Sequence, residues 1–240
     1  MIIGIESFRN WFRGYEDYYV LIGGTACEIL MNEIGTGFRA TKDIDMVLLA
    51  ESLDESFVTH FWEFVKIPGY EHRHKSIDKP IYYRFTNPKS SEYPTMIELF
   101  SRRIEGVELP NNATVMPLQI GDDIASLSAI LLDDVYYSLL RSGVTILDSL
   151  PVLNAAYLIP LKAKAWLDLS ERKANDMHVD SKDIKKHKND ILRLSALLSP
   201  DAVYTLPAAI MEDMRRFLHR VEDPHLFVRV ASAFGLSTHL

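Results

Sequence analysis

The sequence predicts an α/β (α+β) protein in which a mixed-sheet lobe is followed by a helical C-terminal lobe. Two patterns predict this fold class. Helix-like and strand-like segments alternate over roughly the first hundred residues, and from Asn154 onward apolar residues recur at helical spacing. We place the boundary near Pro151, which gives lobes of residues 1–150 and 151–240. The 240 residues, 48% of them hydrophobic and 25% charged, are typical of a folded globular chain.

The first elements are a helix, a buried strand and a second helix. Aromatic residues recur at the spacing of an amphipathic helix, at Phe8, Trp11, Phe12 and Tyr15. Residues 18–22 form an apolar run that ends at two glycines, which predicts a buried strand. A second helix is expected from Thr25 to about Asn32, before a loop that contains Gly35 and Gly37.

More strands and a helix are expected before the boundary. Residues 44–49 form a strand with Asp43 and Asp45 at its beginning, and a helix follows over residues 55–66. Residues 81–85 and 95–100 are the clearest later strands. After Gly106 we expect short β or loop pieces, and the pattern of residues 130–140 fits either a helix or a strand.

The second lobe is expected to be all helical. Its first helix has one apolar face, made of Leu158, Leu161, Ala165 and Leu169. Further helices are expected over residues 181–198, over residues 208–220 and at the C-terminus.

Charge and composition exclude several classes of protein. The net charge of −7 excludes a generally nucleic-acid-binding surface, although the lysine stretch 182–188 is either a solvated helix face or a local track for phosphates. A single cysteine, Cys27, excludes an internal disulfide and a cysteine zinc site. No apolar run approaches the length of a membrane span, and the N-terminus lacks the pattern of a secretory signal. We therefore expect a cytoplasmic protein without a membrane partner.

Paired carboxylates beside a glycine turn carry the chemistry. Asp43 and Asp45 are two residues apart in a strand, so their side chains point to the same face. Such close carboxylates repel each other unless a cation lies between them, and a hard divalent ion such as Mg²⁺ has that preference for oxygen. Gly23 and Gly24 before a helix leave backbone N–H groups open to a phosphate, and Thr25 adds a hydroxyl. This combination suits phosphoryl or nucleotidyl transfer.

Glu98 is the candidate third carboxylate. It stands alone in the apolar strand 95–100, where an unpaired charge is costly unless it binds a partner or a metal. In a two-metal site it would serve as a ligand or as the base for an incoming hydroxyl. The alternative is an edge-strand residue that faces water.

The motif Ile22-Gly23-Gly24-Thr25, followed by Arg39-x-Thr41-x-Asp43-Ile44-Asp45, resembles the signature of the polymerase-beta-like nucleotidyltransferase superfamily. More narrowly, it resembles the abortive-infection-type minimal nucleotidyltransferases, several of which are toxins of toxin–antitoxin pairs. The resemblance implies a metal-dependent enzyme that moves an NMP from an NTP to a hydroxyl of RNA, of a tRNA end or of a protein. It also implies a cognate antitoxin as partner.

The resemblance also implies roles for residues. The NTP would be bound by Gly23, Gly24, Thr25, Arg39 and Thr41, although the last two residues would otherwise only brace the loop by hydrogen bonds. Two Mg²⁺ ions would be held by Asp43, Asp45 and Glu98. The second half of the family's motif is matched by Lys162 or Lys164 and by Asp190, with the lysine on phosphate and the aspartate on base, ribose or the lysine itself. The two lysines lie about 200° apart on a helix, so only one faces the cleft, and Lys162 is preferred.

The chain departs from the family pattern in three respects. Eighteen residues separate Gly24 from Asp43, which is longer than usual, and the loop around residues 35–37 accounts for the excess. Thr25 replaces a common serine, and Glu98 replaces a common aspartate. Two alternatives stay open: an adenylyltransferase of the aminoglycoside type with a small cationic acceptor, and a nucleotide-binding or partner-binding module without turnover. The NTP base, the acceptor and the oligomeric state are not specified by the sequence.

Overall fold

The computed structural model describes residues 2–39, 41–49, 51–72, 81–101, 133–175, 177 and 179–236. These residues form two compact units. One holds the described residues up to 101 together with Val144–Leu153, and the other holds residues 133–143 together with those from 154 onward. Of the short β or loop pieces expected after Gly106, those at residues 107–132 lie outside the described residues, and two short strands at 144–147 and 150–153 are observed. Within the described residues, no helix combines the length and the apolar character that a membrane crossing requires.

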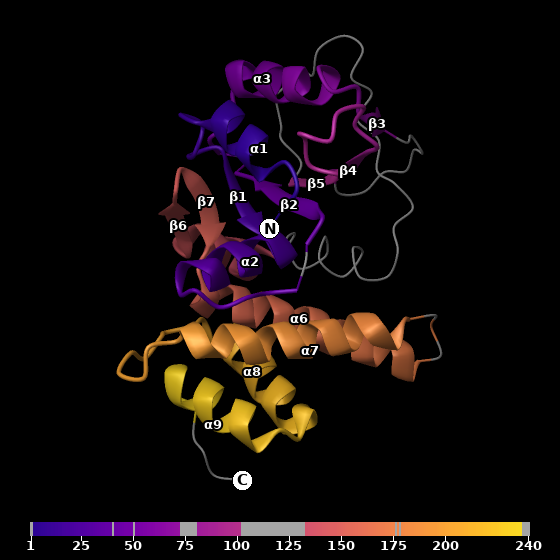
Figure 1. Ribbon diagram of the computed structural model, residues 1–240. Helices are drawn as coiled ribbons and strands as arrows, with labels where there is room; N and C mark the ends of the chain where they lie inside the picture. Colours follow the sequence, from indigo (N-terminus) through magenta and orange to yellow (C-terminus); the bar gives the residue numbers. More distant parts are fainter. Residues whose placement is uncertain are drawn as a thin grey trace. The chain divides into compact units, whose positions relative to one another are not determined.

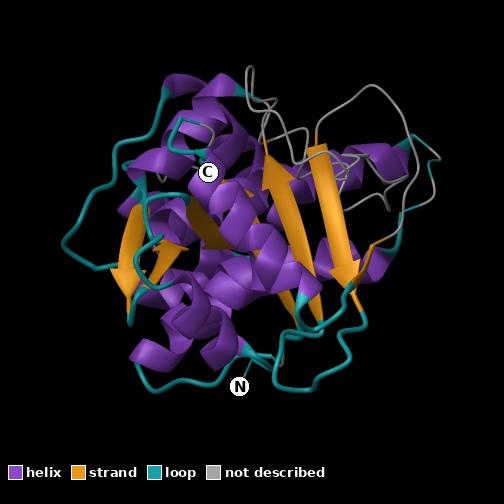
Figure 2. Ribbon diagram, turned by 90° about the horizontal axis from the view of Figure 1, so that it is seen from above, coloured by secondary structure: helices purple, strands orange, loops and turns teal. Residues whose placement is uncertain are grey.

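The first unit is built on a mixed sheet (Figures 1 and 2). Its described strands lie in the order β3-β4-β5-β2-β1-β7-β6. The pairs β2–β5 and β1–β7 are parallel, and the other neighbouring pairs are antiparallel. The strands are β1 (Tyr19–Ile22), β2 (Asp43–Leu48), β3 (Glu71–His72), β4 (Ile81–Thr86), β5 (Met96–Ser101), β6 (Val144–Leu147) and β7 (Leu150–Leu153). The predicted mixed sheet is confirmed.

Aromatic side chains pack two helices against one face of this sheet. The helices of the unit are α1 (Ile5–Phe12), α2 (Gly23–Glu33) and α3 (Glu55–Lys66). The Tyr19 ring on β1 packs edge-on against Phe8 of α1, with 5.7 Å between centroids, and the Phe85 ring on β4 lies 5.6 Å from Phe61 of α3. Side chains alternate along a strand, so Arg84, next to Phe85, points to the opposite face. That opposite face carries the candidate site.

The second unit consists of helices, as predicted. They are α5 (Asp134–Ser142), α6 (Ala155–Ala174), α7 (Ser181–Leu194), the 3-10 turn η1 (Ser195–Leu197), α8 (Ala208–Val221) and α9 (Pro224–Ala233). α6 packs against α5, α7 and α8. Its N-cap is Asn154, whose side chain accepts a hydrogen bond from the Ala156 N–H, as expected for this position. The ambiguous segment 130–140 is helical from Asp134.

The boundary that we placed near Pro151 falls inside β7 of the first unit's sheet. β6 and β7 form a hairpin whose two turn residues, Asp148 and Ser149, both have positive φ, 47° and 59°. Two positive φ angles are typical of the type I′ turns that join adjacent strands closely. α5, earlier in the sequence, belongs to the second unit. The chain therefore leaves the second unit to add this hairpin to the first unit and then returns.

Candidate active site

The two predicted aspartates begin β2, and both are half-exposed on one face of the sheet. In the β1–β2 register, Asp45 pairs with Ile22, the last residue before α2. The start of α2 is hydrogen-bonded to this end of β2 at two points. The Gly24 N–H donates to Asp45 Oδ2 at 3.3 Å, and the Thr25 hydroxyl donates to the Asp43 carbonyl at 2.5 Å. The strand and the helix are thereby fixed to each other beside both carboxylates.

Gly23 and Gly24 make this close approach possible. Gly23 has φ +64°, and a Cβ at this position would lie 1.6 Å from Asp45 Oδ2. A Cβ at Gly24 would lie 2.7 Å from Thr41 Oγ1 and 3.2 Å from Arg39 Nη2. The glycines therefore leave room for side chains of the chain itself, and not only for a ligand.

Arg39 and Thr41 lie beside the first turn of α2, which places two hydrogen-bond donors there. The Arg39 guanidinium lies over the Phe38 ring, 5.3 Å from its centroid. Thr41 is buried, and in the part of the chain that the structure describes its hydroxyl has no hydrogen-bond partner. The N-cap residue Ile22 adds no side-chain hydrogen bond to the helix start. A helix N-terminus with a nearby guanidinium and a buried hydroxyl suits an anion.

Thr25 makes a structural contact that the sequence did not predict. It is fully buried, and its hydroxyl donates to the Asp43 carbonyl. Among these threonines it is Thr41 whose hydroxyl lies against Gly24. Sequence spacing alone does not separate the two, because the loop before β2 folds back onto the helix start.

Glu98 lies on the same face as the aspartates. It pairs with Asp45 in the parallel β2–β5 register, and directly paired residues share a face. Only 7% of the residue is exposed, so it does not face water at an edge. Its carboxylate binds Arg84 of β4, whose Nε and Nη2 both donate to Oε1, at 2.8 and 2.5 Å.

Arg84 is the residue that the sequence reasoning missed. It is a single cation in an apolar and aromatic strand, and Glu98 is a single anion in another. The antiparallel β4–β5 register places them directly opposite each other. Two such isolated opposite charges in neighbouring strands were the available signal.

The carboxylates do not form a three-ligand metal cluster. Over the described residues, no three His, Cys, Asp or Glu side chains are grouped closely enough to hold a metal ion. Asp43 and Asp45 supply two half-exposed oxygen donors on one face, which fits a hard divalent cation. Glu98, engaged with Arg84, does not complete a third position.

The lysine and the aspartate of the second half of the motif meet in the second unit. Lys162 Nζ on α6 lies 2.9 Å from Asp190 Oδ2 on α7. Their side chains are 6% and 0% exposed, respectively. Of the three partners predicted for Asp190, the lysine is the one observed.

Lys164 lies in a separate charged network of the same unit. Its Nζ is 3.3 Å from Asp213 Oδ2 on α8 and 3.7 Å from Asp168. The Tyr136 hydroxyl donates to the same Asp213 oxygen at 3.0 Å. Burial, together with the neighbouring Asp213 carboxylate, raises the pKa of Tyr136, which therefore stays a donor. Lys164 thus joins α6 to α8, and the choice between the two lysines favours Lys162 as the partner of Asp190.

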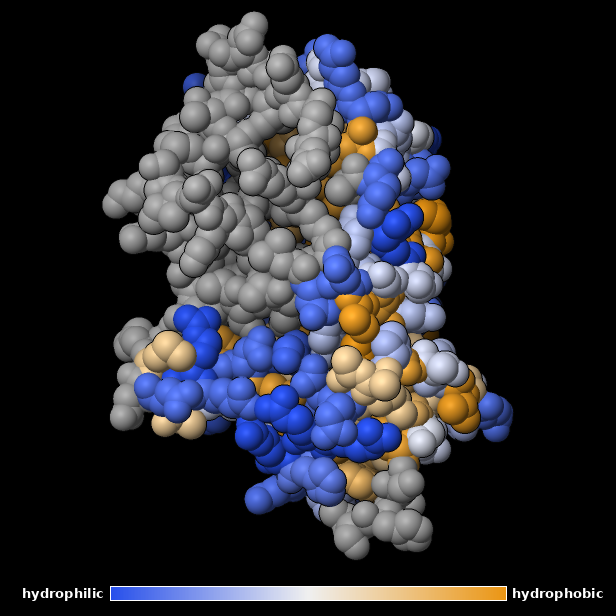
Figure 3. Space-filling view, turned by 180° about the vertical axis from the view of Figure 1, so that it is seen from behind, coloured by the Kyte–Doolittle hydropathy of each residue, from blue (hydrophilic) through white to orange (hydrophobic). Residues whose placement is uncertain are grey.

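The lysine stretch 182–188 lies on α7. Lys182 and Lys185 are exposed, whereas Lys188 donates to the Val221 carbonyl at 3.3 Å and lies 3.8 Å from Asp223. Hydrophilic side chains also gather over one face of the helical unit, as Figure 3 shows. The exposure of Lys182 and Lys185 fits a solvated helix face, on which these two lysines are open to a phosphate.

One solved structure carries the comparison with known proteins. A crystal structure of an antigenic nucleotidyltransferase-like protein from Paracoccidioides brasiliensis aligns with 97% of this chain and 91% of its own, with a TM-score of 0.51 and 14% identity. At this identity the likeness shows the fold. The chain has a nucleotidyltransferase-like fold. No protein-family model and no curated protein sequence matches it.

Proposed function

We propose that this chain is a metal-dependent nucleotidyltransferase that moves an NMP group from an NTP to a hydroxyl acceptor on RNA, on a tRNA end or on a protein. One observation carries the proposal: the start of α2 is hydrogen-bonded to the aspartate end of β2, at Gly24 and at Thr25. A helix N-terminus that attracts phosphate therefore adjoins two carboxylates on one face. The likeness in fold to a nucleotidyltransferase-like protein supports this class of reaction.

The triphosphate is assigned to the first turn of α2. There the Arg39 guanidinium and the Thr41 hydroxyl lie against Gly24, and the N-cap residue Ile22 makes no side-chain hydrogen bond to the helix start. Arginine binds phosphate oxygens through a planar fork of donors, and a hydroxyl adds a single donor. The unpartnered Thr41 hydroxyl would gain a hydrogen bond when a phosphate binds.

Asp43 and Asp45 are the residues that would hold Mg²⁺. Their donor chemistry fits, because both offer carboxylate oxygens from one face, and oxygen is the ligand that a hard divalent cation prefers. When bound, Mg²⁺ supplies Lewis-acid stabilisation of charge on phosphate oxygens. In the reaction, the acceptor oxygen bonds to the α-phosphorus as the bond to the β-phosphate breaks. The products are the nucleotidylated acceptor, pyrophosphate and a proton. The part that Lys162 and Asp190 play in this reaction stays a prediction.

The test is transfer of label from each α-³²P-labelled NTP, incubated with the full chain, Mg²⁺ and total cell extract. The wild type is expected to label RNA or protein, and Asp43→Asn is expected to abolish labelling, because the variant keeps the geometry but loses a ligand charge. Asp201→Asn, an exposed carboxylate of the second unit, is the matched control and retains labelling. An active and folded Asp43→Asn variant would contradict the mechanism.

The same experiment distinguishes the alternatives. Label on a small amine-rich acceptor would identify the adenylyltransferase of the aminoglycoside type. Measurable NTP binding without any labelled product would identify the module without turnover. The toxin role, proposed on the resemblance alone, predicts that induced expression arrests growth, that Asp43→Asn does not, and that a cognate antitoxin protein relieves the arrest.

A further inference from the structure

A hollow in the surface of the second unit lies between α9 and the chain around η1. Its volume is about 780 Å³, which is within the range of ligand sites in proteins. One wall is a side of α9, and the other is η1 with the residues that follow it as far as Pro200. Both walls belong to the second unit, and α9 packs against η1. The candidate active site on the sheet of the first unit is a different site.

Hydrogen-bond donors recur along the α9 wall. His225, Arg229 and Ser232 are separated by four and then three residues, so they form one stripe on the helix. All three are exposed, and Ser199 adds an exposed hydroxyl from the opposite wall. At about 1.5 Å per residue the stripe is about 10 Å long, with Arg229 inside it. The donors therefore extend over a greater length than one phosphate group can contact.

The hollow is positively charged, although the chain as a whole has a net charge of −7. Among the described residues that line it, none is an aspartate or a glutamate. Over the same described part of the chain, the Arg229 guanidinium has no ion-pair partner. A guanidinium offers a planar fork of donors that matches the oxygens of a phosphate. The lining therefore favours an anion.

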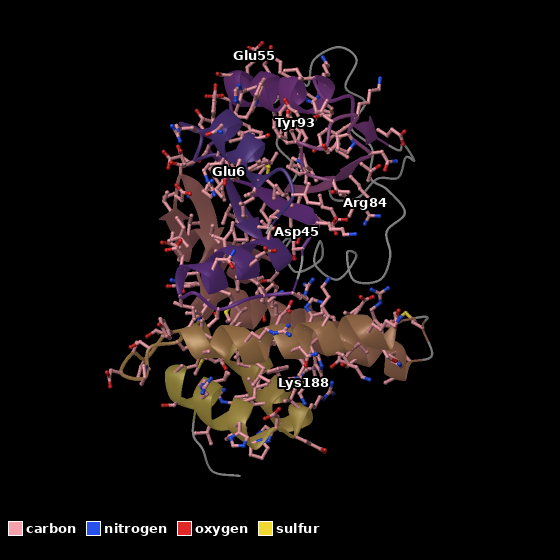
Figure 4. The ribbon with its side chains drawn as sticks, in the orientation of Figure 1. Glu6, Asp45, Glu55, Arg84, Tyr93 and Lys188 are labelled. Carbon is pink, nitrogen blue, oxygen red and sulfur yellow. The ribbon has the colours of Figure 1, made fainter. Side chains whose placement is uncertain are left out.

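The acidic residue next to this wall is engaged elsewhere. Asp223 is the N-cap of α9, and its carboxylate accepts a hydrogen bond from the Leu226 N–H at 3.1 Å. It also lies 3.8 Å from Nζ of Lys188 on α7, which Figure 4 labels. Asp223 is thus bound to the start of its own helix and to a lysine, and it does not neutralise Arg229.

Apolar side chains lie among these donors. Val228, next to Arg229 on α9, is 61% exposed, and the exposed prolines Pro200 and Pro224 come from the two walls. A simple inorganic anion gains nothing from such contacts. A nucleotide strand does, because its bases offer apolar faces beside its phosphates. An exposed hollow with recurring donors and apolar walls suits such a strand.

We propose that this hollow binds a segment of single-stranded RNA, with backbone phosphates on the α9 stripe and bases against the apolar side chains. The choice of RNA rests on the proposed function, which includes RNA among its acceptors. The hollow would then hold the acceptor by its backbone, without reading its sequence. An acidic peptide could pair with Arg229 but would leave the apolar walls without a flat partner, so RNA is favoured.

The experiment measures binding of a fluorescein-labelled oligouridylate of about ten nucleotides to the full chain, by fluorescence anisotropy at several salt concentrations. Arg229→Gln is expected to weaken binding about tenfold. It should also reduce the slope of log affinity against log salt by about 0.7, as for one phosphate contact. Val228→Asp, which adds a carboxylate beside Arg229, should weaken binding as well. The matched control is Arg215→Gln, an exposed arginine of α8 paired with Glu212, which should bind as the wild type does.

Several results would overturn the inference. These are no binding by the folded wild type, or wild-type affinity and salt slope in a folded Arg229→Gln variant. Displacement of the RNA by inorganic phosphate or by UMP at equal phosphate concentration would identify a site for a single phosphate instead. Equal displacement by an oligoglutamate of the same charge would identify an acidic peptide as the partner. Circular dichroism checks folding, and Val228→Asp decides if Arg229→Gln does not fold.

Failure of this inference is distinguishable from failure of the proposed function. Asp43→Asn should bind the RNA as the wild type does, because it changes only the first unit. RNA binding that depends on Arg229, in a chain that transfers no label, would overturn the proposed function and leave the inference standing. Transfer to RNA at limiting RNA concentration, equally efficient in Arg229→Gln and the wild type, would do the reverse.

Discussion

The aspartates that the family resemblance singles out lie in opposite environments in the two units. Asp43 and Asp45 of the first unit are half-exposed at the start of β2, where a ligand can reach them. Asp190 of the second unit is fully buried against Lys162, itself 6% exposed on its side chain. The same resemblance pointed to all of them, yet burial separates their roles. A change in the first group should affect chemistry, whereas a change in the second should affect folding.

The largest effect on stability is expected from Asp190→Ala. The variant leaves the Lys162 ammonium buried without its anion, which costs about 3–5 kcal/mol of unfolding free energy. Urea unfolding followed by circular dichroism measures this loss, and Asp43→Asn should stay within about 1 kcal/mol of the wild type. The double change Lys162→Met with Asp190→Leu should recover most of the stability. A small loss of unfolding free energy in Asp190→Ala would contradict the structural role of the buried aspartate, because the Lys162–Asp190 pair would then not be needed for the fold.

Gly23→Ala is expected to have the next largest effect, and Gly35→Ala is its matched control. Both glycines have positive φ, +64° and +69°, so an alanine costs about 1–2 kcal/mol at either position. At Gly23 the new Cβ also collides with Asp45 Oδ2, whereas at Gly35 nothing lies within 4 Å. Gly23→Ala should therefore lose about 1–3 kcal/mol more unfolding free energy than Gly35→Ala. It should also lose labelling activity. Equal losses in the two variants would show that the start of α2 does not depend on contact with Asp45.

The two threonines beside α2 are expected to respond in opposite ways. Thr25→Val removes the hydrogen bond to the Asp43 carbonyl and should cost about 1 kcal/mol of stability. Thr41→Val removes a hydroxyl without a partner in the described residues, so stability should be unchanged or slightly raised. Nucleotide binding, measured with a fluorescent NTP, should weaken in Thr41→Val. Normal binding in that variant would remove Thr41 from the phosphate site.

The smallest effect concerns Asp54, an exposed carboxylate with a structural role. The Phe57 N–H and the Tyr18 hydroxyl both donate to it, at 2.8 and 2.9 Å, and lower the pKa of Asp54 in the folded state. A lowered pKa stabilises the fold above the unfolded value and loses this contribution as the pH falls through the folded value. Asp54→Asn keeps an N-cap without titrating, so it should lose less stability than the wild type between about pH 5 and about pH 3. An equal loss of unfolding free energy in the two proteins between these pH values would contradict this role of Asp54.

Local pattern predicted much of the fold. The helix over residues 55–66 coincides with α3, because its aromatic residues recur at helical spacing and Asp54 precedes them as a cap. The β6–β7 hairpin was expected only as short β or loop pieces, because its turn contains Asp148 and Ser149 instead of the glycine that usually marks such turns. The boundary near Pro151 was placed where the β-rich part of the sequence gives way to the helical part, and β7 spans that point.

The site was predictable where one strand or one turn defines it. Asp43 and Asp45 share a face by their spacing alone, and Glu98 was found because a single carboxylate in an apolar strand needs a partner. Arg84 was missed because its partner is identified only by the β4–β5 register, a pairing of distant segments. The hydrogen bond from Thr25 to the Asp43 carbonyl was missed because it depends on how the loop before β2 returns to α2.

The β6–β7 hairpin has a consequence for biosynthesis. β1 pairs with β2 on one side and with β7 on the other, and β7 ends more than a hundred residues after β1. A nascent chain that has not yet released residue 153 from the ribosome therefore exposes the open edge of β1, where a foreign strand can add. During translation, protection of that edge must come from outside the sheet until the hairpin emerges.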